Sequence, residues 1–170
     1  MKGMSYIVEV LKHSSLLEDK LKEIIEIKSI RWKYTYEEHF NWIKENIRLN
    51  DYHVLVYLDG KLVAYTNFVN VLVQINNEDI PFMGVGNVCT SISGKGYGNL
   101  LMEEVRNILI NKGWSGILFC KENLIPYYKK FLWRKVDKND ILNKLDTKVN
   151  IMIINYLGVI KELNYQDRNF

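Results

Sequence analysis

The chain has 170 residues, 48% of them hydrophobic and 25% charged, so it is long enough to fold as one globular domain with a substantial core. Its formal net charge of +3 is too small to favour nucleic acid as a partner, although it leaves room for an anionic small ligand. No apolar run approaches the roughly 18 residues of a membrane span, and no signal peptide is recognisable, so we expect a cytoplasmic protein that binds no membrane.

The N-terminal third of the chain is predicted to form one strand and two helices. The strand is expected over Ser5–Leu11. A helix is expected over Ser14–Trp32, because Ser14 can cap it and apolar residues recur at helical spacing behind it. A second helix is expected over Tyr34–Ile47 on the same periodicity.

The middle of the chain is predicted to be rich in strands. His53–Ile75 holds two β-rich runs joined at Asp59-Gly60, a dipeptide typical of type I′ turns because both positions need a positive φ. Asn76-Asn77 marks a second turn, and the next strand is expected over Ile80–Ile92.

The second half is predicted to alternate helices and strands. The expected elements are a helix at Gly98–Lys112, a strand at Gly116–Cys120, a short helix at Leu124–Phe131 and a last strand at Lys148–Leu157. The resulting order, β-α-α-β-β-β-α-β-α-β, predicts an α/β (α+β) fold in which a mixed sheet is flanked by helices. The apolar last strand could also pair with its copy in a homodimer.

The two cysteines give little sign of chemistry. Cys89 and Cys120 lie in apolar runs without CxxC spacing, so we expect reduced, buried thiols and no metal site. A nucleophilic role for Cys89 is disfavoured, because no histidine lies near it in sequence and cysteine is among the most buried residue types.

A cluster of glycines carries the main functional signal. Gly94, Gly96 and Gly98 stand between a predicted strand and a predicted helix. Backbone amides at a helix N-terminus are unpaired and favour anions, so this segment suits a pyrophosphate. A P-loop is excluded because Lys95 is followed by Gly96, and the spacing is not that of a dinucleotide-binding loop. A connector without a ligand remains the alternative.

The order of these motifs resembles the GNAT superfamily of acetyl-CoA-dependent N-acetyltransferases. The glycine motif falls on Ser93–Gly98, and a later tyrosine-containing turn motif falls on Tyr128–Trp133. Over roughly residues 50 to 140, the resemblance implies a mostly antiparallel sheet that splays near the CoA loop, and a single acetyltransferase domain over 1–170. Two positions depart from the family pattern: Ser93 replaces the usual Arg or Gln, and Leu132 replaces the usual turn glycine, so that turn is expected to use another geometry.

The resemblance also implies a mechanism and a set of site residues. Acetyl would pass directly from acetyl-CoA to a primary amine of a small molecule, with Tyr128 as the acid that protonates the leaving thiolate. The residues expected to bind CoA are Val88, Cys89 and Thr90 through their backbone, then Gly94, Lys95, Gly96, Tyr97, Gly98 and Asn99, and finally Asn123. Asn123 could equally be the N-cap of the helix that follows.

The acceptor side is less defined by the sequence. The base cannot be assigned among Glu78, Asp79, Glu37, Glu38 and His39, and a water could serve instead. The aromatic residues of Ile30–Trp42 either fill the core or line an acceptor pocket. In the second case the candidate residues are Trp32, Tyr34, Tyr36 and Glu37, and an acidic aromatic pocket would suit a cation such as an aminoglycoside.

Two other functions remain open at this stage. The first is a CoA-binding or sensing domain that has the fold but little turnover, which Ser93 and the unassigned base favour. The second is a nucleotide-phosphate module with no preference for CoA.

Overall fold

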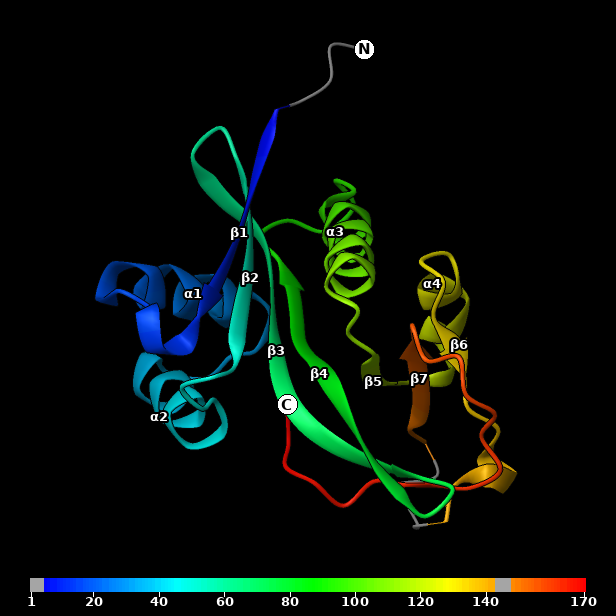
Figure 1. Ribbon diagram of the computed structural model, residues 1–170. Helices are drawn as coiled ribbons and strands as arrows, with labels where there is room; N and C mark the ends of the chain where they lie inside the picture. Colours follow the sequence, from blue (N-terminus) through cyan, green and yellow to red (C-terminus); the bar gives the residue numbers. More distant parts are fainter. Residues whose placement is uncertain (1–4, 143–147) are drawn as a thin grey trace. The chain divides into compact units, whose positions relative to one another are not determined.

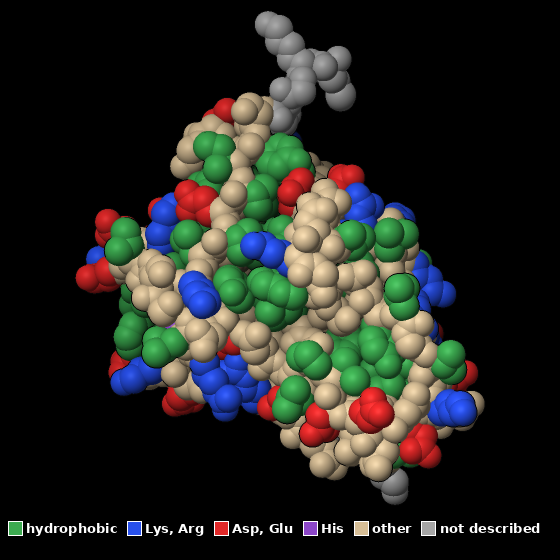
Figure 2. Space-filling view, viewed as in Figure 1, with side chains coloured by type: hydrophobic (Ala, Val, Ile, Leu, Met, Phe, Trp, Pro, Cys, Tyr) green, Lys and Arg blue, Asp and Glu red, His purple; other side chains and the backbone are tan. Residues whose placement is uncertain are grey.

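The computed structural model describes residues 5–142 and 148–170, and its backbone groups into two compact units. One unit contains the chain up to Val69 together with Gly86–Glu104 and Phe170, and the other contains Asn70–Val85 and Val105–Asn169. No helix in those described ranges is long and apolar enough to cross a membrane. Figure 2 shows Lys and Arg side chains interspersed with Asp and Glu on the visible face, in keeping with the small net charge.

The main elements occur in the expected order (Figure 1). The strands are β1 (Tyr6–Lys12), β2 (Tyr52–Leu58), β3 (Lys61–Ile75), β4 (Glu78–Thr90), β5 (Gly116–Cys120), β6 (Arg134–Lys135), β7 (Asn150–Ile154) and β8 (Leu163–Asn164). The α-helices are α1 (Glu18–Arg31), α2 (Tyr36–Asn46), α3 (Tyr97–Lys112) and α4 (Ile125–Lys129), with short 3-10 helices η1 (His13–Ser15), η2 (Glu122–Leu124) and η3 (Lys138–Asp140).

Backbone hydrogen bonds join the described strands into an eight-stranded sheet of order β1-β2-β3-β4-β5-β7-β6, with β8 paired to β3. The β1–β2, β2–β3, β5–β7 and β6–β7 ladders are antiparallel. The β4–β5 ladder is parallel and short, since it pairs Met83 with Gly116 and Gly84 with Ile117. The expected mixed, mostly antiparallel sheet flanked by helices is therefore confirmed.

Both predicted turns adopt the backbone that their residues favour. Asp59 and Gly60 have φ of 49° and 76°, as a two-residue turn with positive φ at both positions requires. Asn76 and Asn77 have φ of 50° and 67°. Asparagine tolerates this left-handed region better than most residues, so the second hairpin needs no glycine.

The predicted starts of the first two helices were less accurate. Ser14 lies in η1 and does not cap α1, whose N-cap is Leu17 with no side-chain hydrogen bond. The start of α2 does have a signal in the sequence, a capping box formed by Thr35 and Glu38. The Thr35 side chain accepts a hydrogen bond from the Glu38 amide, while the Glu38 carboxylate accepts one from the Thr35 amide. This capping box starts α2 at Tyr36 rather than at Tyr34.

In the second unit, the end of α3 and the start of β5 depend on close packing. Gly113 has a φ of 66°, and Trp114 N–H and Gly113 N–H donate to the carbonyls of Leu109 and Ile110, which is a Schellman end. A Cβ on Gly116 would lie 2.8 Å from side-chain atoms of both Leu109 and Ile154, so this strand residue must be small.

The apolar strand predicted over Lys148–Leu157 is present, but it already has a partner strand on both sides. The strand is shorter, Asn150–Ile154, and it pairs with β5 on one side and with β6 on the other. The sequence did not predict β6 or β8, because a two-residue strand carries no periodic signal.

A buried chain of neutral hydrogen bonds links β2 and β3 in the first unit. His53 is fully buried, its Nδ1 lies 2.7 Å from the Tyr65 hydroxyl, and its Nε2 lies 2.9 Å from His13 Nδ1. Burial lowers the pKa of His53 to about 3. The arrangement fits a Tyr65 hydroxyl that donates to His53, which in turn donates to His13, a tautomer assigned from these contacts.

We predict that this network makes the protein less stable in acid. Between the unfolded pKa of 6.5 and the folded value of about 3, the unfolded state binds a proton at His53 that the folded state does not, so stability falls as pH decreases. From pH 6.5 to 5 the loss from this group is about 1.5 kcal/mol. The free energy of unfolding of wild type and of His53→Gln, measured by urea denaturation at several pH values in this range, should converge toward acid pH. Parallel curves would contradict the assignment.

Candidate functional site

The glycine-rich turn joins β4 to the start of α3. Gly94 and Gly96 have φ of 76° and 79°, and a Cβ on either would meet no atom within 4 Å. The backbone conformation, rather than crowding, therefore requires these two glycines. Lys95 between them is exposed, as is Ser93.

The first turn of α3 adds free amides beside these glycines. The Gly96 carbonyl accepts the Leu100 amide at 3.1 Å, which begins the helical pattern. The amides of Tyr97, Gly98 and Asn99 consequently have no partner within the helix. An open turn, unpaired amides and one exposed ammonium group fit a phosphate-bearing ligand.

Just before this turn, β4 contains a left-handed residue. Asn87 has a φ of 52°, and its Nδ2 donates to Asn67 Oδ1 at 2.6 Å. The Thr66 hydroxyl donates to the Gly86 carbonyl at 2.7 Å. These two bonds from β3 hold an irregularity inside β4 that would otherwise cost free energy.

The strand residues after Asn87 differ in exposure. Val88 and Thr90 are half-buried, whereas Cys89 is 4% exposed. Burial raises the pKa of the Cys89 thiol to about 12, which leaves it protonated at neutral pH. This is the opposite of what a nucleophilic thiol requires.

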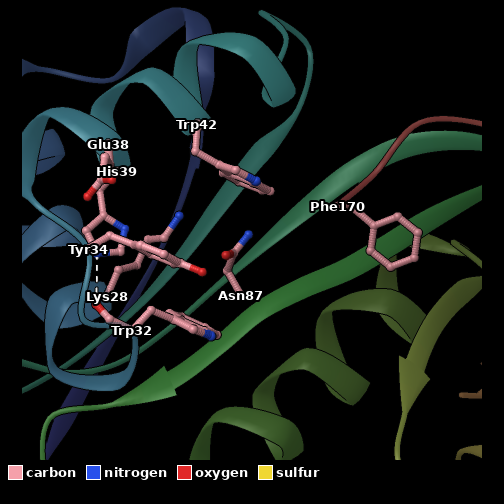
Figure 3. A pocket seen from close by; sticks show the side chains of 8 residues that line it. All are labelled: Lys28, Trp32, Tyr34, Glu38, His39, Trp42, Asn87 and Phe170. Carbon is pink, nitrogen blue, oxygen red and sulfur yellow. Dashed lines mark hydrogen bonds between the residues drawn. The ribbon is translucent and has the colours of Figure 1, made fainter. Parts of the chain in front are cut away.

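A cavity of about 480 Å³ lies in the first unit, between α1, α2 and β4 (Figure 3). This volume is within the range of small-molecule sites. Its lining consists of Lys28 from α1, Trp32 and Tyr34 from the α1–α2 connection, Glu38, His39 and Trp42 from α2, Asn87 from β4, and Phe170. Gly86 allows Phe170 to approach, because a Cβ there would overlap the Phe170 carbonyl group.

The cavity contains part of the predicted acceptor set. Trp32 and Tyr34 line it, whereas Tyr36 and Glu37 are exposed and are not among its lining residues. Helical geometry explains the difference, because Trp42 follows Glu38 by four residues and His39 by three, which places it beside both on one face of α2. The aromatic residues do not form a core: Trp32 and Trp42 are only half-buried.

Two ionisable residues of α2, Glu38 and His39, line the cavity, and each makes a hydrogen bond within the fold. Glu38 Oε2 accepts the Thr35 amide at 2.7 Å, and this hydrogen bond lowers the pKa of the carboxyl group. His39 is 3% exposed and its Nε2 lies 3.1 Å from the Trp32 carbonyl oxygen. Since a carbonyl only accepts, Nε2 carries the proton and donates. Burial lowers the pKa of His39, so the ring is neutral at pH 7 and Nδ1 carries the lone pair.

Lys28 is the cavity residue least expected from the sequence. It is 2% exposed, and its Nζ lies 4.2 Å from the centre of the Trp42 ring. Burial lowers the pKa of its ammonium group to about 8. Its only sequence signal is its place on the apolar face of α1, beside the buried Ile24, Ile25 and Ile27.

Tyr128 lies in the second unit, on α4. Its side chain is 8% exposed, and its ring packs edge-on against Tyr127 and Trp133. Burial raises the pKa of its hydroxyl group to about 12, with smaller effects from Tyr127 and Cys120. Asn123 is exposed in η2, and the N-cap of α4 is Leu124, so the alternative role of Asn123 as a helix cap is not realised.

The chain is similar to known proteins in structure but not in sequence. The sequence matches no protein-family model and no functionally curated protein. In structure, the chain is similar to YhbS of Escherichia coli, a GNAT-family N-acetyltransferase solved with CoA, at a TM-score of 0.67 and 15% identity over 98% of this chain and 92% of that one. The chain has the GNAT fold.

Two further solved structures support the same fold. ElaA of Escherichia coli is similar at a TM-score of 0.63 and 17% identity, over 88% of this chain and 99% of that one. An acyl-CoA N-acyltransferase of Pseudomonas aeruginosa is similar at a TM-score of 0.62 and 18% identity, over 88% and 99% of the two chains.

The turn after α4 corrects one expectation drawn from the GNAT motif. Leu132 was expected to force another geometry, yet it has a φ of 67°, the left-handed conformation that glycine favours. Its amide lies 3.2 Å from the Lys129 carbonyl oxygen, and its side chain is 63% exposed. The leucine therefore tolerates backbone strain of about 1–2 kcal/mol with little compensating burial.

Substitutions at Leu132 should reveal this strain. Leu132→Gly should leave the free energy of unfolding unchanged or raise it by up to about 1 kcal/mol, because the relief of strain exceeds the added chain entropy. Leu132→Val should lower it by about 1 kcal/mol, since a β-branched residue is still less suited to positive φ. Chemical denaturation of both variants measures the difference. If Leu132→Gly and Leu132→Val were equally stable, the position would be unstrained.

Proposed function

We propose that residues 1–170 form a single acetyltransferase domain that transfers acetyl from acetyl-CoA to the primary amine of a small molecule. The observation that carries this proposal is the GNAT fold, shared over 98% of the chain with a structure solved with CoA. The open glycine turn and the aromatic cavity support it independently, because they suit a phosphate-bearing cofactor and a small acceptor respectively. The buried, unpaired thiols of Cys89 and Cys120 agree with a cytoplasmic setting.

The residues present at the start of α3 fit CoA. We assign its pyrophosphate to the turn from Gly94 through Lys95 and Gly96 to the amides of Tyr97, Gly98 and Asn99, where Lys95 adds positive charge. The half-buried backbone at Val88–Thr90 and the exposed Asn123 are the remaining proposed contacts. When bound, acetyl-CoA supplies an acetyl group activated as a thioester.

The aromatic cavity is the proposed acceptor site, and His39 is its proposed base. An amine must lose a proton before it can attack, and His39 is a neutral imidazole with its Nδ1 lone pair available at pH 7. Glu38 is less suited, because its carboxylate is engaged in the cap of α2.

Tyr128 is the proposed proton donor. Its raised pKa keeps the hydroxyl group protonated throughout the neutral range, and that hydroxyl makes no hydrogen bond to the described residues. The proton is therefore available to a leaving group rather than committed to the fold.

A second candidate function is a GNAT-like domain that binds CoA with little turnover. The observation that favours it is Ser93, an exposed serine where the family motif has Arg or Gln. Ligand binding and turnover, measured separately, distinguish the two.

We predict that acetyl-CoA and CoA, but not ATP or NAD, raise the melting temperature. A ligand at about 100 times its Kd adds about 2.7 kcal/mol of stability. Gly98 lies inside α3, where alanine is favoured over glycine, so Gly98→Ala should not lower the melting temperature of the free protein but should reduce the shift caused by CoA. The control Gly113→Ala, at the positive-φ end of the same helix, should lower the melting temperature and leave the CoA shift intact. A full CoA shift in Gly98→Ala would remove the turn from the binding site.

We also predict that Tyr128→Phe folds normally but turns over slowly. Phenylalanine preserves the ring packing, and the hydroxyl group has no partner to lose among the described residues. Release of CoA thiol in the presence of an acceptor amine should fall by roughly 10²- to 10⁴-fold, the usual contribution of a positioned acid. Tyr127→Phe is the matched control and should retain activity. If both variants are equally active, Tyr128 is not the acid.

A further inference from the structure

The ammonium group of Lys28 is buried without a counter-charge. The side chain is 2% exposed, and no described Asp or Glu carboxylate lies within 4 Å of its Nζ. Burial is the main influence on its pKa, opposed only weakly by the nearby Cys89 thiol. The Trp42 ring at 4.2 Å offers a cation–π contact, which does not neutralise a charge.

Lys20, on the same helix, makes a similar aromatic contact but also has a counter-charge. Its Nζ also lies 4.2 Å from the centre of an aromatic ring, that of Tyr57. There, however, Glu9 Oε2 lies 3.0 Å away, and the Tyr57 hydroxyl accepts a hydrogen bond at 2.8 Å. Lys20 is thus compensated within the fold, whereas Lys28 is not.

The other ionisable groups of the cavity do not replace the missing partner. Glu38 is exposed and its carboxylate accepts the Thr35 amide. His39 is neutral at pH 7 and donates from Nε2 to the Trp32 carbonyl. Figure 3 shows the Lys28 side chain extending from α1 toward Trp42 within the cavity. A buried charge without a partner is costly, and an anion that enters the cavity would remove this cost.

We propose that the acceptor carries a carboxylate that pairs with the Lys28 ammonium group, while its apolar part packs against Trp32, Tyr34 and Trp42. This rests on the proposed function, because it names the substrate class of that same site: a small amine that is also an acid, as an amino acid is. It differs from the cationic acceptor that the sequence left open as one possibility. That possibility relied on Glu37, which is not among the cavity residues, and on Glu38, whose carboxylate is engaged by the Thr35 amide at the cap of α2.

Matched acceptor pairs test the proposal on the wild-type protein. L-phenylalanine, L-leucine and L-glutamine are each compared with their amides, which keep the shape and remove the charge of the carboxylate. Release of CoA thiol gives kcat/KM, expressed per neutral amine so that differences in amine pKa do not matter. We expect at least one acid to exceed its amide by roughly 10- to 100-fold, as a charged hydrogen bond allows. Amides that are equal or better in all three pairs would overturn the proposal.

Lys28→Met tests the residue itself, with Lys20→Met as the matched control. Lys28→Met should reduce kcat/KM for the preferred acid by roughly 10- to 100-fold and leave its amide unchanged. Lys20→Met should leave the ratio of acid to amide as in wild type, because Lys20 is not among the cavity residues. Equal losses on acid and amide would assign Lys28 to another role and overturn the proposal. If Lys28→Met does not fold, the wild-type pairs still decide.

A binding measurement separates failure of this inference from failure of the proposed function. The melting temperature of the protein without CoA is measured with each acid and each amide. If CoA neither binds nor is released, the proposed function fails, and a shift with an acid but not with its amide still supports the carboxylate site. If thiol is released but acids are not preferred, the proposed function stands and this inference fails.

Discussion

The position of Asn87 opposite Asn67 is the constraint on which the proposed acceptor site depends. The turn at Asn76-Asn77 folds β4 back on β3, and the 2.6 Å bond between the two asparagine side chains then holds Asn87 in a left-handed conformation. An irregularity of this kind re-aims the residues around it. On one side of it Asn87 itself lines the cavity, and on the other the strand continues through Val88–Thr90 to the glycine turn. One asparagine pair therefore connects the proposed acceptor cavity and the proposed cofactor loop within a single unit.

Much of the fold could be predicted because its signals are local. Asp59-Gly60, Asn76-Asn77 and the apolar run of β5 each determine their own conformation, and the strand at Gly116–Cys120 was predicted to the residue. The start of α2 was missed even though Thr35 and Glu38 form a recognisable capping box. The two-residue strands β6 and β8 could not be predicted, since only their partners in the sheet define them.

The candidate site was only partly predictable, because a cavity is defined by contacts between elements. The glycine turn could be found since positive φ restricts which residues fit. Trp32 and Tyr34 could be proposed from composition, but the choice between Glu37 and Glu38 depends on which face of α2 meets the rest of the unit. For Lys28 the only signal was its place on the apolar face of α1, because a lysine on a helix is normally exposed, and only the structure shows this one to be 2% exposed.

The protonation states of the proposed site residues form a consistent set. Burial raises the pKa of Tyr128 to about 12 and lowers that of His39 below its ordinary value, so a protonated acid and a neutral base coexist across the neutral range. Lys28 is the exception, because its pKa of about 8 means that its charge is lost in mild alkali, where amines become more reactive. A carboxylate beside Lys28 would favour the charged form and raise that pKa again. Binding of an acidic acceptor and retention of the Lys28 proton are therefore coupled, so such an acceptor would itself preserve the charge that recognises it.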